Sequence, residues 1–387
     1  MPAAPSAARF SLHAAIDEIP AADWDALAPG QPFLRHAFLS LLEATGCVSR
    51  EAGWVPAHAA LWEEGEEEGD HAPRLLAAMP LYLKHHSYGE FVFDWAWADA
   101  YHRNGLDYYP KWLAAVPFSP IPGPRLLGRD DAARRTLLAA VQDAAAQSGL
   151  SSLHILFADE DECRWGEAAG FMRRESVQFH WHNRGWRDFD DFLSAMSHDK
   201  RKKIRQERRR VADAGVSLRV LEGPAIREVD WLFFERCYAH TYALHHSTPY
   251  LNREFFLRLG REMPRHCVML VASRDGNDIG ASLLLRDDEV LYGRYWGALE
   301  QVSCLHFEAC YYAPIAYAIA QGLQRFEGGA QGEHKLSRGL EPVVTHSLHW
   351  LADARFQDAV ARYLQRESGG MAEYVDELER RSPFKLP

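Results

Sequence analysis

The sequence predicts an α/β protein built from two domains of similar size, and three observations support this fold class. The chain has 387 residues, which is long for one hydrophobic core, so its length favours two domains. Hydrophobic residues make up 47% and charged residues 25%, the balance of a globular protein. Both halves also follow one order of elements: a strand, helices, an antiparallel meander, a helix and further strands.

The first half alternates strand and helix patterns. Helical spacing is clearest at residues 130–148, where apolar positions recur with the period of an amphipathic helix and Gly149 follows as a C-cap. The other predicted helices are residues 32–46 and 160–170, and the predicted strands are residues 10–18, 54–63, 75–85, 152–158 and 175–182.

The second half repeats this order of elements without repeating residues. Asp275-Gly276-Asn277 and Asp287-Asp288 are turn sequences between three strand patterns, which predicts an antiparallel meander. The predicted strands are residues 216–222, 266–273, 279–286, 290–296, 323–327 and 344–351, and the predicted helices are residues 228–246, 253–263, 307–322 and a helical tail. The basic stretch after residues 183–198 marks the change of domain, which predicts domains at residues 1–185 and 186–387.

Composition and charge narrow the class of protein. The formal net charge of −11 argues against a protein that coats nucleic acid, so no stable nucleic-acid partner is expected. The six cysteines form no CxxC pair, which fits reduced thiols. The N-terminus lacks a secretory pattern, and no run reaches the roughly 18 apolar residues of a membrane span. These features predict a cytoplasmic protein.

Several familiar catalytic patterns are absent from the sequence. There is no HExxH or CxxC pattern, so no metal site is predicted. The run GGAQGEHK looks like a phosphate loop, but Glu333-His334 separates Gly332 from Lys335, and a Walker A motif needs GK together. No GxGxxG and no GxSxG occur either. Nucleotide hydrolysis, dinucleotide binding and a serine nucleophile are therefore excluded.

The segment FEGGAQGEHKLSRGL, residues 326–340, is the richest in chemistry. Its glycines, Gly329 and Gly332 among them, indicate unusual backbone angles or the close approach of a ligand to the chain. Five ionisable residues surround the glycines: Glu327, Glu333, His334, Lys335 and Arg338. The alternative is a surface turn that a Glu333–Arg338 ion pair stabilises.

A second group of candidates lies in the meander and in the helix after it. In YGRYWG, residues 292–297, strand alternation places Arg294 and Trp296 on one face and Tyr295 on the other. An arginine among aromatic residues needs a carboxylate partner or a bound anion. His306 begins the next helix, where it is either a general base or a capping histidine.

Two further segments give candidate binding residues. Residues 88–109 combine aromatic and carboxylate side chains, which suit either the wall of a ligand cleft or an aromatic core strand with a capping Asp; the candidates are Asp94, Trp97, Tyr101 and His102. The basic run KRKKIRQERRR, residues 200–210, is either a solvated helix or an anion-binding helix, with Lys202 and Arg205 as candidates.

These segments together resemble a known family. GEFVFDWAWADAY, PFSPIPGPRLL, SHDKRKKIRQERR, LYGRYWG, LHFEACYY and FEGGAQGEHKLSRGL are similar to the FemAB-like predicted N-acyltransferases, of the peptidoglycan biosynthesis/recognition type, in the GNAT superfamily. The resemblance covers roughly residues 30–370. It implies two tandem GNAT-like domains, each a mixed, largely antiparallel sheet flanked by helices.

The resemblance also implies a reaction. It implies transfer of an acyl or aminoacyl group from an activated donor to an amine on a small-molecule or peptide-like acceptor. Lys335 occupies the place of a lysine that contributes to the substrate groove of Fem transferases. The acetyl-coenzyme A signature of ordinary GNAT enzymes is replaced by EQVSCLH, and the long coiled-coil arm of Fem transferases has no counterpart. Acyl-coenzyme A and aminoacyl-tRNA both stay open as donors, and no other cofactor is predicted.

The roles follow from this reaction. Lys335, Arg338 and Arg294 would hold an anionic group and the developing oxyanion, while Glu333, Glu327 or His306 would accept the amine proton. Asp94, Trp97, Tyr101 and His102 would line the acceptor side. The alternative is a non-catalytic protein that recognises a peptidoglycan precursor or a peptide.

Overall fold

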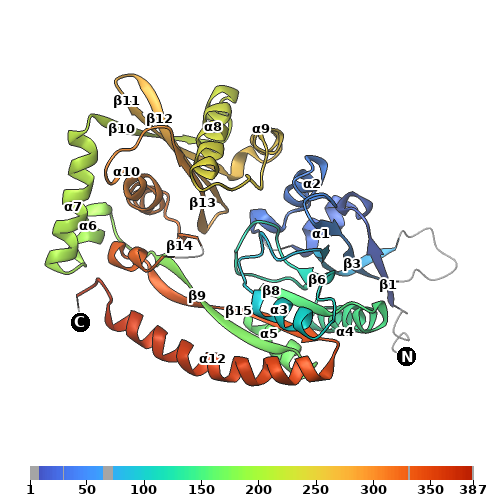
Figure 1. Ribbon diagram of the computed structural model, residues 1–387. Coiled ribbons are helices and arrows are strands. Elements are labelled where there is room, and N and C mark those ends of the chain that lie inside the picture. The colour runs from blue at the N-terminus through green and yellow to red at the C-terminus, as the bar shows by residue number, and fades with distance from the viewer. Residues whose placement is uncertain (1–7, 29, 64–72, 330–331, 386–387) are drawn as a thin grey trace, which may run out of the picture. The chain divides into compact units, whose positions relative to one another are not determined.

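The computed structural model describes residues 8–28, 30–63, 73–329 and 332–385 (Figure 1). The chain divides into two compact units: unit 1 is Met1–Ser176 with Thr345–Met371, and unit 2 is Val177–Val344 with Ala372–Pro387. Each unit therefore combines segments that are distant in the sequence. The domain boundary between residues 185 and 186 stays a prediction.

Unit 1 contains two sheets. The first is antiparallel, in the order β1 (Ala8–His13), β3 (His58–Glu63), β4 (Arg74–Met79), β7 (Leu127–Gly128). The second has the order β2 (Trp54–Pro56), β5 (Leu81–Lys84), β6 (Lys111–Ala114), β8 (Ser152–Ala158), β15 (Glu341–Leu351). The chain passes between the sheets at Ala57 and Pro80, so the strands predicted at 54–63 and 75–85 are each two strands.

One helix of unit 1 agrees with the sequence at both ends. In α4 (Asp131–Ser148) the side chain of Asp130 accepts a hydrogen bond from the backbone N–H of Ala133, and Gly149 ends the helix in the left-handed conformation. The predicted strand 10–18 is wrong beyond His13, because a 3₁₀ helix (Ile16–Glu18) follows. The other helices are α1 (Ala21–Leu27), a 3₁₀ turn (Pro32–Leu34), α2 (His36–Ala44), α3 (Trp95–Arg103) and α5 (Glu160–Ala168).

Unit 2 is built on one sheet in the order β10 (Val216–Glu222), β11 (Cys267–Arg274), β12 (Asn277–Arg286), β13 (Val290–Ala298), β14 (Arg325–Glu327), β9 (Met172–His182). The predicted meander is confirmed. Its first turn has positive φ angles at Asp275 and Gly276, as a two-residue hairpin turn requires. Only the pair β13 and β14 is parallel among the described pairings of this sheet.

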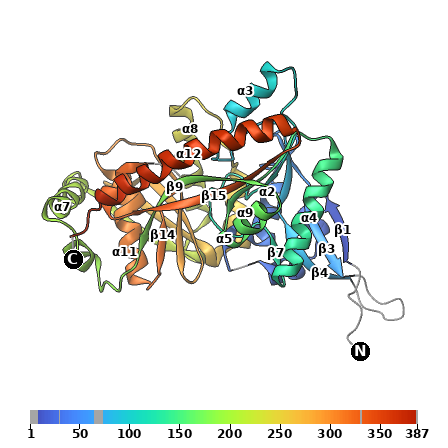
Figure 2. The same ribbon diagram turned by 90° about the horizontal axis from the view of Figure 1, so that it is seen from below.

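The helix predicted at residues 307–322 is interrupted. It consists of α10 (Leu305–Phe307), a π-helical turn (Glu308–Tyr312) and α11 (Ala313–Ala320). The remaining helices are α6 (Phe189–Ser194), α7 (His198–Asp213), α8 (Glu228–Leu244), α9 (Arg253–Glu262), α12 (Ala354–Arg380) and 3₁₀ turns at Gly223–Ala225, Pro264–His266 and Glu333–Arg338. In Figure 2 the long α12 is seen along its length.

A strand from the other half of the sequence completes the sheet of each unit. In unit 2, His180–His182 of β9 pair antiparallel with β14. In unit 1, residues 346–351 of β15 pair antiparallel with β8. In both units this strand follows a parallel pair, β6 with β8 in unit 1 and β13 with β14 in unit 2. The parallel pair is the common feature on which the two units can be compared.

Candidate active site

The parallel strands β13 and β14 separate just beyond their last paired residues. Their pairing runs from Val290 with Arg325 to Tyr292 with Glu327. The next residue is glycine on both strands, and a Cβ on Gly328 would lie 2.6 Å from the Leu340 side chain. A larger residue would therefore not fit at this point. Where the strands part, a pocket of about 240 Å³ opens.

A β-bulge turns Arg294 into this pocket. Leu283 pairs with Tyr295 and Leu284 pairs with Gly293, so Arg294 is an extra residue in β13. The prediction that Tyr295 faces away from Arg294 and Trp296 is wrong, because the bulge breaks the alternation and all three residues line the pocket. The lining is Ser282, Leu283, Leu284, Gly293, Arg294, Tyr295, Trp296, His306, Cys310, Tyr311, Gly328, Gly329 and Lys335.

The pocket is cationic, because its lining contains Arg294 and Lys335 and neither Asp nor Glu. Lys335 is only 3% exposed, and its Nζ donates a hydrogen bond to the Gly329 carbonyl at 2.9 Å. Among the described residues it has no carboxylate partner. Burial lowers the pKa of Lys335 to about 8 and also lowers the pKa of Arg294. Both side chains are thus set to meet an anionic or carbonyl group.

His306 is the pocket residue that can accept a proton. Burial, together with the nearby His334, Arg338 and Lys335, lowers its pKa to about 4. The imidazole is therefore neutral at pH 7. The π-helical turn behind it is fixed to the sheet, since the Ser282 hydroxyl donates to the Ala309 carbonyl at 2.8 Å. π-helical turns are frequent at functional sites.

The other residues of the glycine-rich segment lie outside the pocket lining. Arg338 is buried and pairs with Glu207 at 3.1 Å. Glu333 pairs with Arg381 at 2.9 Å and accepts a hydrogen bond from the hydroxyl of Tyr374. The predicted Glu333–Arg338 pair is therefore wrong. Glu333 and Arg338 are the two ends of the short 3₁₀ helix whose Lys335 lines the pocket.

Glu327 and Gly332 stand beside the pocket. Glu327 is buried and pairs with Arg325 at 3.1 Å, and burial raises its pKa to about 7. Gly332 precedes the 3₁₀ helix with a φ of 114°, and a Cβ there would meet the His334 ring at 2.5 Å. Glycine is thus required at residue 332 by backbone conformation and by space.

The predicted residues of unit 1 lie in different surroundings. Trp97 and Tyr101 are buried in a hydrophobic cluster with Leu351, Val360 and Leu364. His102 is exposed on α3. The alternative of an aromatic core strand is also wrong, because residues 95–103 form a helix. Only Asp94 enters a polar site.

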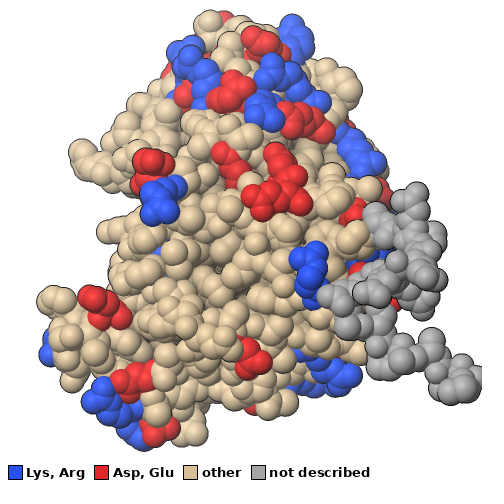
Figure 3. Space-filling view, turned by 90° about the vertical axis from the view of Figure 1, so that its right-hand side faces the viewer, with Lys and Arg blue, Asp and Glu red and all other residues tan. Residues whose placement is uncertain are grey.

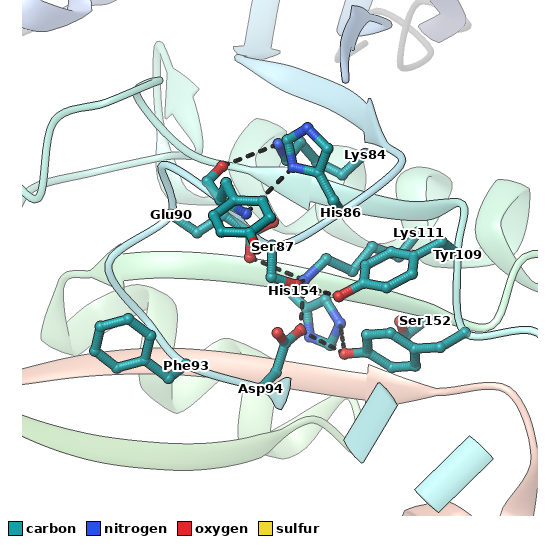
Figure 4. A network of polar contacts seen from close by, with 12 residues as sticks. Lys84, His86, Ser87, Glu90, Phe93, Asp94, Tyr109, Lys111, Ser152 and His154 are labelled. Atoms are coloured by element: carbon teal, nitrogen blue, oxygen red, sulfur yellow. Dashed lines mark hydrogen bonds and ion pairs between the residues drawn. The ribbon is translucent and has the colours of Figure 1, made fainter. Parts of the chain in front are cut away.

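That site is a buried network around Lys111 (Figure 4). The Lys111 ammonium donates to Ser87 and Glu90, each at 2.8 Å, and to Asp94. Burial lowers the pKa of Lys111, but the two carboxylates more than offset this effect and hold the pKa above its usual value. Burial raises the pKa of Glu90 to about 7. Lys111 is therefore a fully paired structural cation.

A chain of hydrogen bonds continues from Asp94 through unit 1. The Tyr108 hydroxyl donates to Asp94 at 2.6 Å, so it must accept the bond that joins it to Nε2 of His154 at 3.0 Å. Nδ1 of His154 then accepts from Nδ1 of His349 at 2.8 Å, and the Ser347 hydroxyl donates to Nε2 of His349. Burial lowers the pKa of His154 to about 3, so this chain is neutral beyond Asp94.

The basic residues Lys202 and Arg205 are exposed on α7. They line a surface hollow of about 440 Å³ with His198, Arg201, Gln206 and Arg209. Arg205 already pairs with Asp190 at 3.2 Å. Figure 3 draws another face of the protein, on which Lys and Arg are interspersed with Asp and Glu. The anion-binding role of Lys202 and Arg205 stays a prediction.

Sequence reasoning identified four pocket residues: Arg294, His306, Gly329 and Lys335. It missed Ser282, Cys310 and Tyr311, whose local sequence is ordinary for a strand and a helix. It also missed the Lys111 network. The sequence contains a signal for that network, because a lysine stands at the end of two otherwise apolar strands. These are Lys84 in LYLK and Lys111 in KWLA.

Other classes of site were examined in the described part of the chain. No group of His, Cys, Asp and Glu there could hold a metal ion. The six cysteines are free thiols. Among the helices of the described residues, none combines the length and the apolar character that a membrane span requires.

The fold and the pocket define the class: a tandem GNAT-fold protein. Crystal structures support this class. FemX shares 10% identity at a TM-score of 0.53, over 89% of this chain and 98% of FemX. A conserved protein of unknown function from Bacteroides thetaiotaomicron shares 11% identity at a TM-score of 0.51, over 89% of this chain and 100% of that one. These identities show the fold alone.

The FemAB-like family model, described as peptidoglycan biosynthesis/recognition, matches residues 15–386, and the chain belongs to this family. The resemblance and the fold class predicted from the sequence are thus confirmed. A tandem GNAT protein from the clavulanic acid biosynthesis pathway, solved without acetyl-coenzyme A, is also similar at 14% identity and a TM-score of 0.46, over 90% of this chain and 99% of that one. No curated protein matches the sequence significantly.

Proposed function

We propose that the chain is an N-acyltransferase that moves an acyl or aminoacyl group from an activated donor to an amine. The observation that carries this proposal is the pocket between the parting strands of unit 2. It brings Arg294 and Lys335 together without a carboxylate in its lining. A buried structural lysine would have a carboxylate partner, so Lys335, which has none among the described residues, favours a ligand with negative or developing negative charge, and Arg294 adds a second cation to the same lining.

Lys335 and Arg294 would act at one step of the reaction. The amine nitrogen attacks the donor carbonyl carbon, a C–N bond forms, and the carbonyl oxygen becomes an oxyanion. Lys335 and Arg294 would stabilise this oxyanion, which exists only on the reaction path. As it collapses, the C–S bond of a thioester donor or the C–O bond of an aminoacyl ester breaks. Acyl-coenzyme A and aminoacyl-tRNA both remain candidates.

The amine must lose a proton during the attack. His306 is the best candidate for the acceptor of that proton, because it lines the pocket and is neutral at pH 7. It would then pass the proton to the departing sulfur or oxygen. Glu327 is a weaker candidate, since Arg325 holds it outside the lining, and Glu333 is weaker still because it pairs with Arg381.

The family description favours an acceptor related to peptidoglycan. The similar structure with the TM-score of 0.53 is named FemX, so its name contains Fem, as the name of the FemAB-like family does. We therefore place an amine of a peptidoglycan precursor, or of a peptide like it, first among the acceptors.

The test is a product screen with the purified full chain. Acyl-coenzyme A thioesters and aminoacyl-tRNAs would each be incubated with amines that include peptidoglycan stem peptides, and amide products would be detected by mass spectrometry. We expect one donor class to give product with the wild type and neither Lys335→Met nor Arg294→Met to do so.

The matched control is Glu333→Gln, which changes a charge of the same segment outside the pocket. Product from wild type and from Lys335→Met at the same rate would contradict the assignment of the pocket. If no donor gives product while a stem peptide still binds, the chain is a recognition protein instead.

A further inference from the structure

The loop at residues 88–95 of unit 1 exposes an unusual number of aromatic side chains. Tyr88 is 59% exposed, Phe91 38%, Phe93 54% and Trp95 40%. Single exposed apolar residues are normal, but a group of them marks a binding surface. The rings of Tyr88 and Trp95 touch, with centroids 5.0 Å apart and planes at 60°. We call residues 88–95 the aromatic loop.

The buried network holds the aromatic loop from beneath. Lys111 contacts Ser87, Glu90 and Asp94, all three of which are buried. Because these contacts fix positions 87, 90 and 94, the aromatic side chains between them are directed to solvent. Figure 4 shows Phe93 pointing away from the network. Phe91 has a φ of 64°, a conformation that bulky residues adopt only where their surroundings impose it.

Acceptor oxygens beneath the loop favour a cation above it. The carboxyl groups of Glu90 and Asp94 both contact the ammonium of Lys111. Each keeps one buried oxygen, Oε1 of Glu90 and Oδ1 of Asp94, that has no hydrogen-bond partner among the described residues. No Lys or Arg occurs between residues 85 and 102. The ring faces of aromatic residues also attract positive charge.

Two other cations approach the loop, and both are engaged. Lys84 donates to the Tyr88 carbonyl at 3.2 Å and lies 3.8 Å over the Trp54 ring. Burial lowers the pKa of Lys84 to about 7, so a cation above the loop would favour its neutral form. Arg174 donates to the Phe93 carbonyl at 2.6 Å and is neutralised by Glu367 at 2.8 Å.

We propose that the aromatic loop is a binding site for a ligand that carries a protonated primary alkylamine. Tyr88 and Trp95 would hold the ammonium against their ring faces, and Phe91 and Phe93 would contact the alkyl chain. This site goes beyond the proposed transfer reaction, because its binding of the amine needs neither the donor nor the pocket of unit 2. The sequence-based candidates Trp97 and Tyr101 are replaced, because they are buried.

The test compares n-pentylamine, which is protonated at pH 7, with n-pentanol, its neutral analogue of similar shape. Binding to the full chain would be measured by saturation-transfer NMR without any acyl donor. We expect n-pentylamine to bind at least about fivefold more tightly than n-pentanol, the size of one cation–π contact. Tyr88→Ala and Trp95→Ala should each weaken n-pentylamine binding by about the same factor.

The control is Leu244→Ala, which removes an exposed apolar side chain of unit 2 and should leave the affinity unchanged. Equal affinity for n-pentanol would overturn the proposal, since the loop would then be an apolar surface for another kind of partner. Unchanged affinity in Tyr88→Ala and Trp95→Ala would overturn it too. Loss of acyl transfer in Lys335→Met, with amine binding intact, would leave this site standing, so the two proposals fail separately.

Discussion

Unit 1 and unit 2 each bury a lysine close to their parallel strand pair, and the two lysines differ in their partners. Lys111 begins β6 and meets Ser87, Glu90 and Asp94. Lys335 follows β14, and among the described residues its ammonium donates to the carbonyl of Gly329 alone. A buried cation with two carboxylates is satisfied within the fold, whereas one with a single carbonyl retains capacity for a ligand. We therefore assign a structural role to Lys111 and a role in the proposed reaction to Lys335.

The parallel strand pairs of the two units differ as well. In unit 2 β13 and β14 part at Gly293 and Gly328, and a pocket opens there. In unit 1 the chain beyond β6 turns back instead, and the Gly123 amide donates to the Phe157 carbonyl at the end of β8. The strand pair of unit 2 thus opens onto a pocket, whereas in unit 1 the returning chain is hydrogen-bonded to the second strand of the pair. Experiments on matched residues can break or sharpen this contrast.

The largest effect is expected for Lys111→Met. Removing the ammonium leaves two buried carboxyl groups without their cation, which should lower the free energy of unfolding by about 3–5 kcal/mol. Urea denaturation followed by circular dichroism measures this. Lys335→Met is the matched variant, and it should leave the stability equal or higher because it removes a buried charge that lacks a carboxylate. Equal losses in both variants would end the distinction between the two lysines.

The next effect concerns catalysis. Lys335→Met should lower kcat/KM by about 10²–10³-fold with the donor and acceptor that the product screen identifies, because it removes one stabiliser of the oxyanion. Steady-state kinetics measures this change. Conversely, Lys111→Gln, studied at a temperature where it stays folded, should retain most of its turnover. A collapse of turnover in folded Lys111→Gln would place Lys111 in the chemistry as well.

The pH dependence of the reaction rate tests whether the reaction needs the charge of Lys335. The pKa of Lys335 is lowered to about 8 by burial, so its charge is present below pH 8 and lost above it. The rate that depends on this charge should fall toward tenfold per pH unit above about pH 8. In Lys335→Arg the fall should move to higher pH, because guanidinium stays charged. A profile that is the same in both proteins would exclude Lys335 as the titrating group.

The lowered pKa of Lys335 also affects stability. Raising the pH should lower the reaction rate but increase the contribution of Lys335 to stability. Lys335 has a lower pKa folded than unfolded, so between pH 8 and its usual pKa the unfolded chain binds more protons. The contribution of Lys335 to stability therefore rises with pH in this window. Urea midpoints of wild type and Lys335→Met should converge as the pH is raised through it.

A smaller effect on stability is expected for a substitution at Gly328, where β13 and β14 separate. In Gly328→Ala the new Cβ would lie 2.6 Å from the Leu340 side chain, which should cost about 1–3 kcal/mol by overpacking. Gly369→Ala in α12 is the control. A Cβ there meets nothing within 4 Å, so this variant should gain about 0.5–1 kcal/mol of helix stability. Equal stability of both variants would mean that residue 328 tolerates a side chain.

The smallest effect is expected for Glu333→Gln. Its carboxylate pairs with Arg381 and Tyr374 instead of facing the pocket. We expect unchanged kcat/KM. A loss as large as that of Lys335→Met would restore Glu333 as a catalytic base.

Most elements of secondary structure could be predicted because their signals are local. The strands at 152–158 and 216–222 have the predicted bounds, and α4 begins and ends at its predicted caps. The interrupted helix at 305–320 could not be predicted, since its π-helical turn depends on a hydrogen bond from Ser282 in a distant strand. The exchange of β9 and β15 between units depends on pairing partners that are far apart in the sequence.

The sequence by itself determined the element order, the meander and the segment in which Lys335 and Gly329 lie, because periodicity, turn residues and glycine act on neighbouring residues. Only the tertiary structure decided which charges face a ligand. A bulge turns Arg294 inward, a 3₁₀ helix carries Glu333 away, and the Lys111 network turns aromatic side chains of residues 88–95 outward. A buried charge is defined by its surroundings, and those surroundings come from segments that meet only in the folded chain.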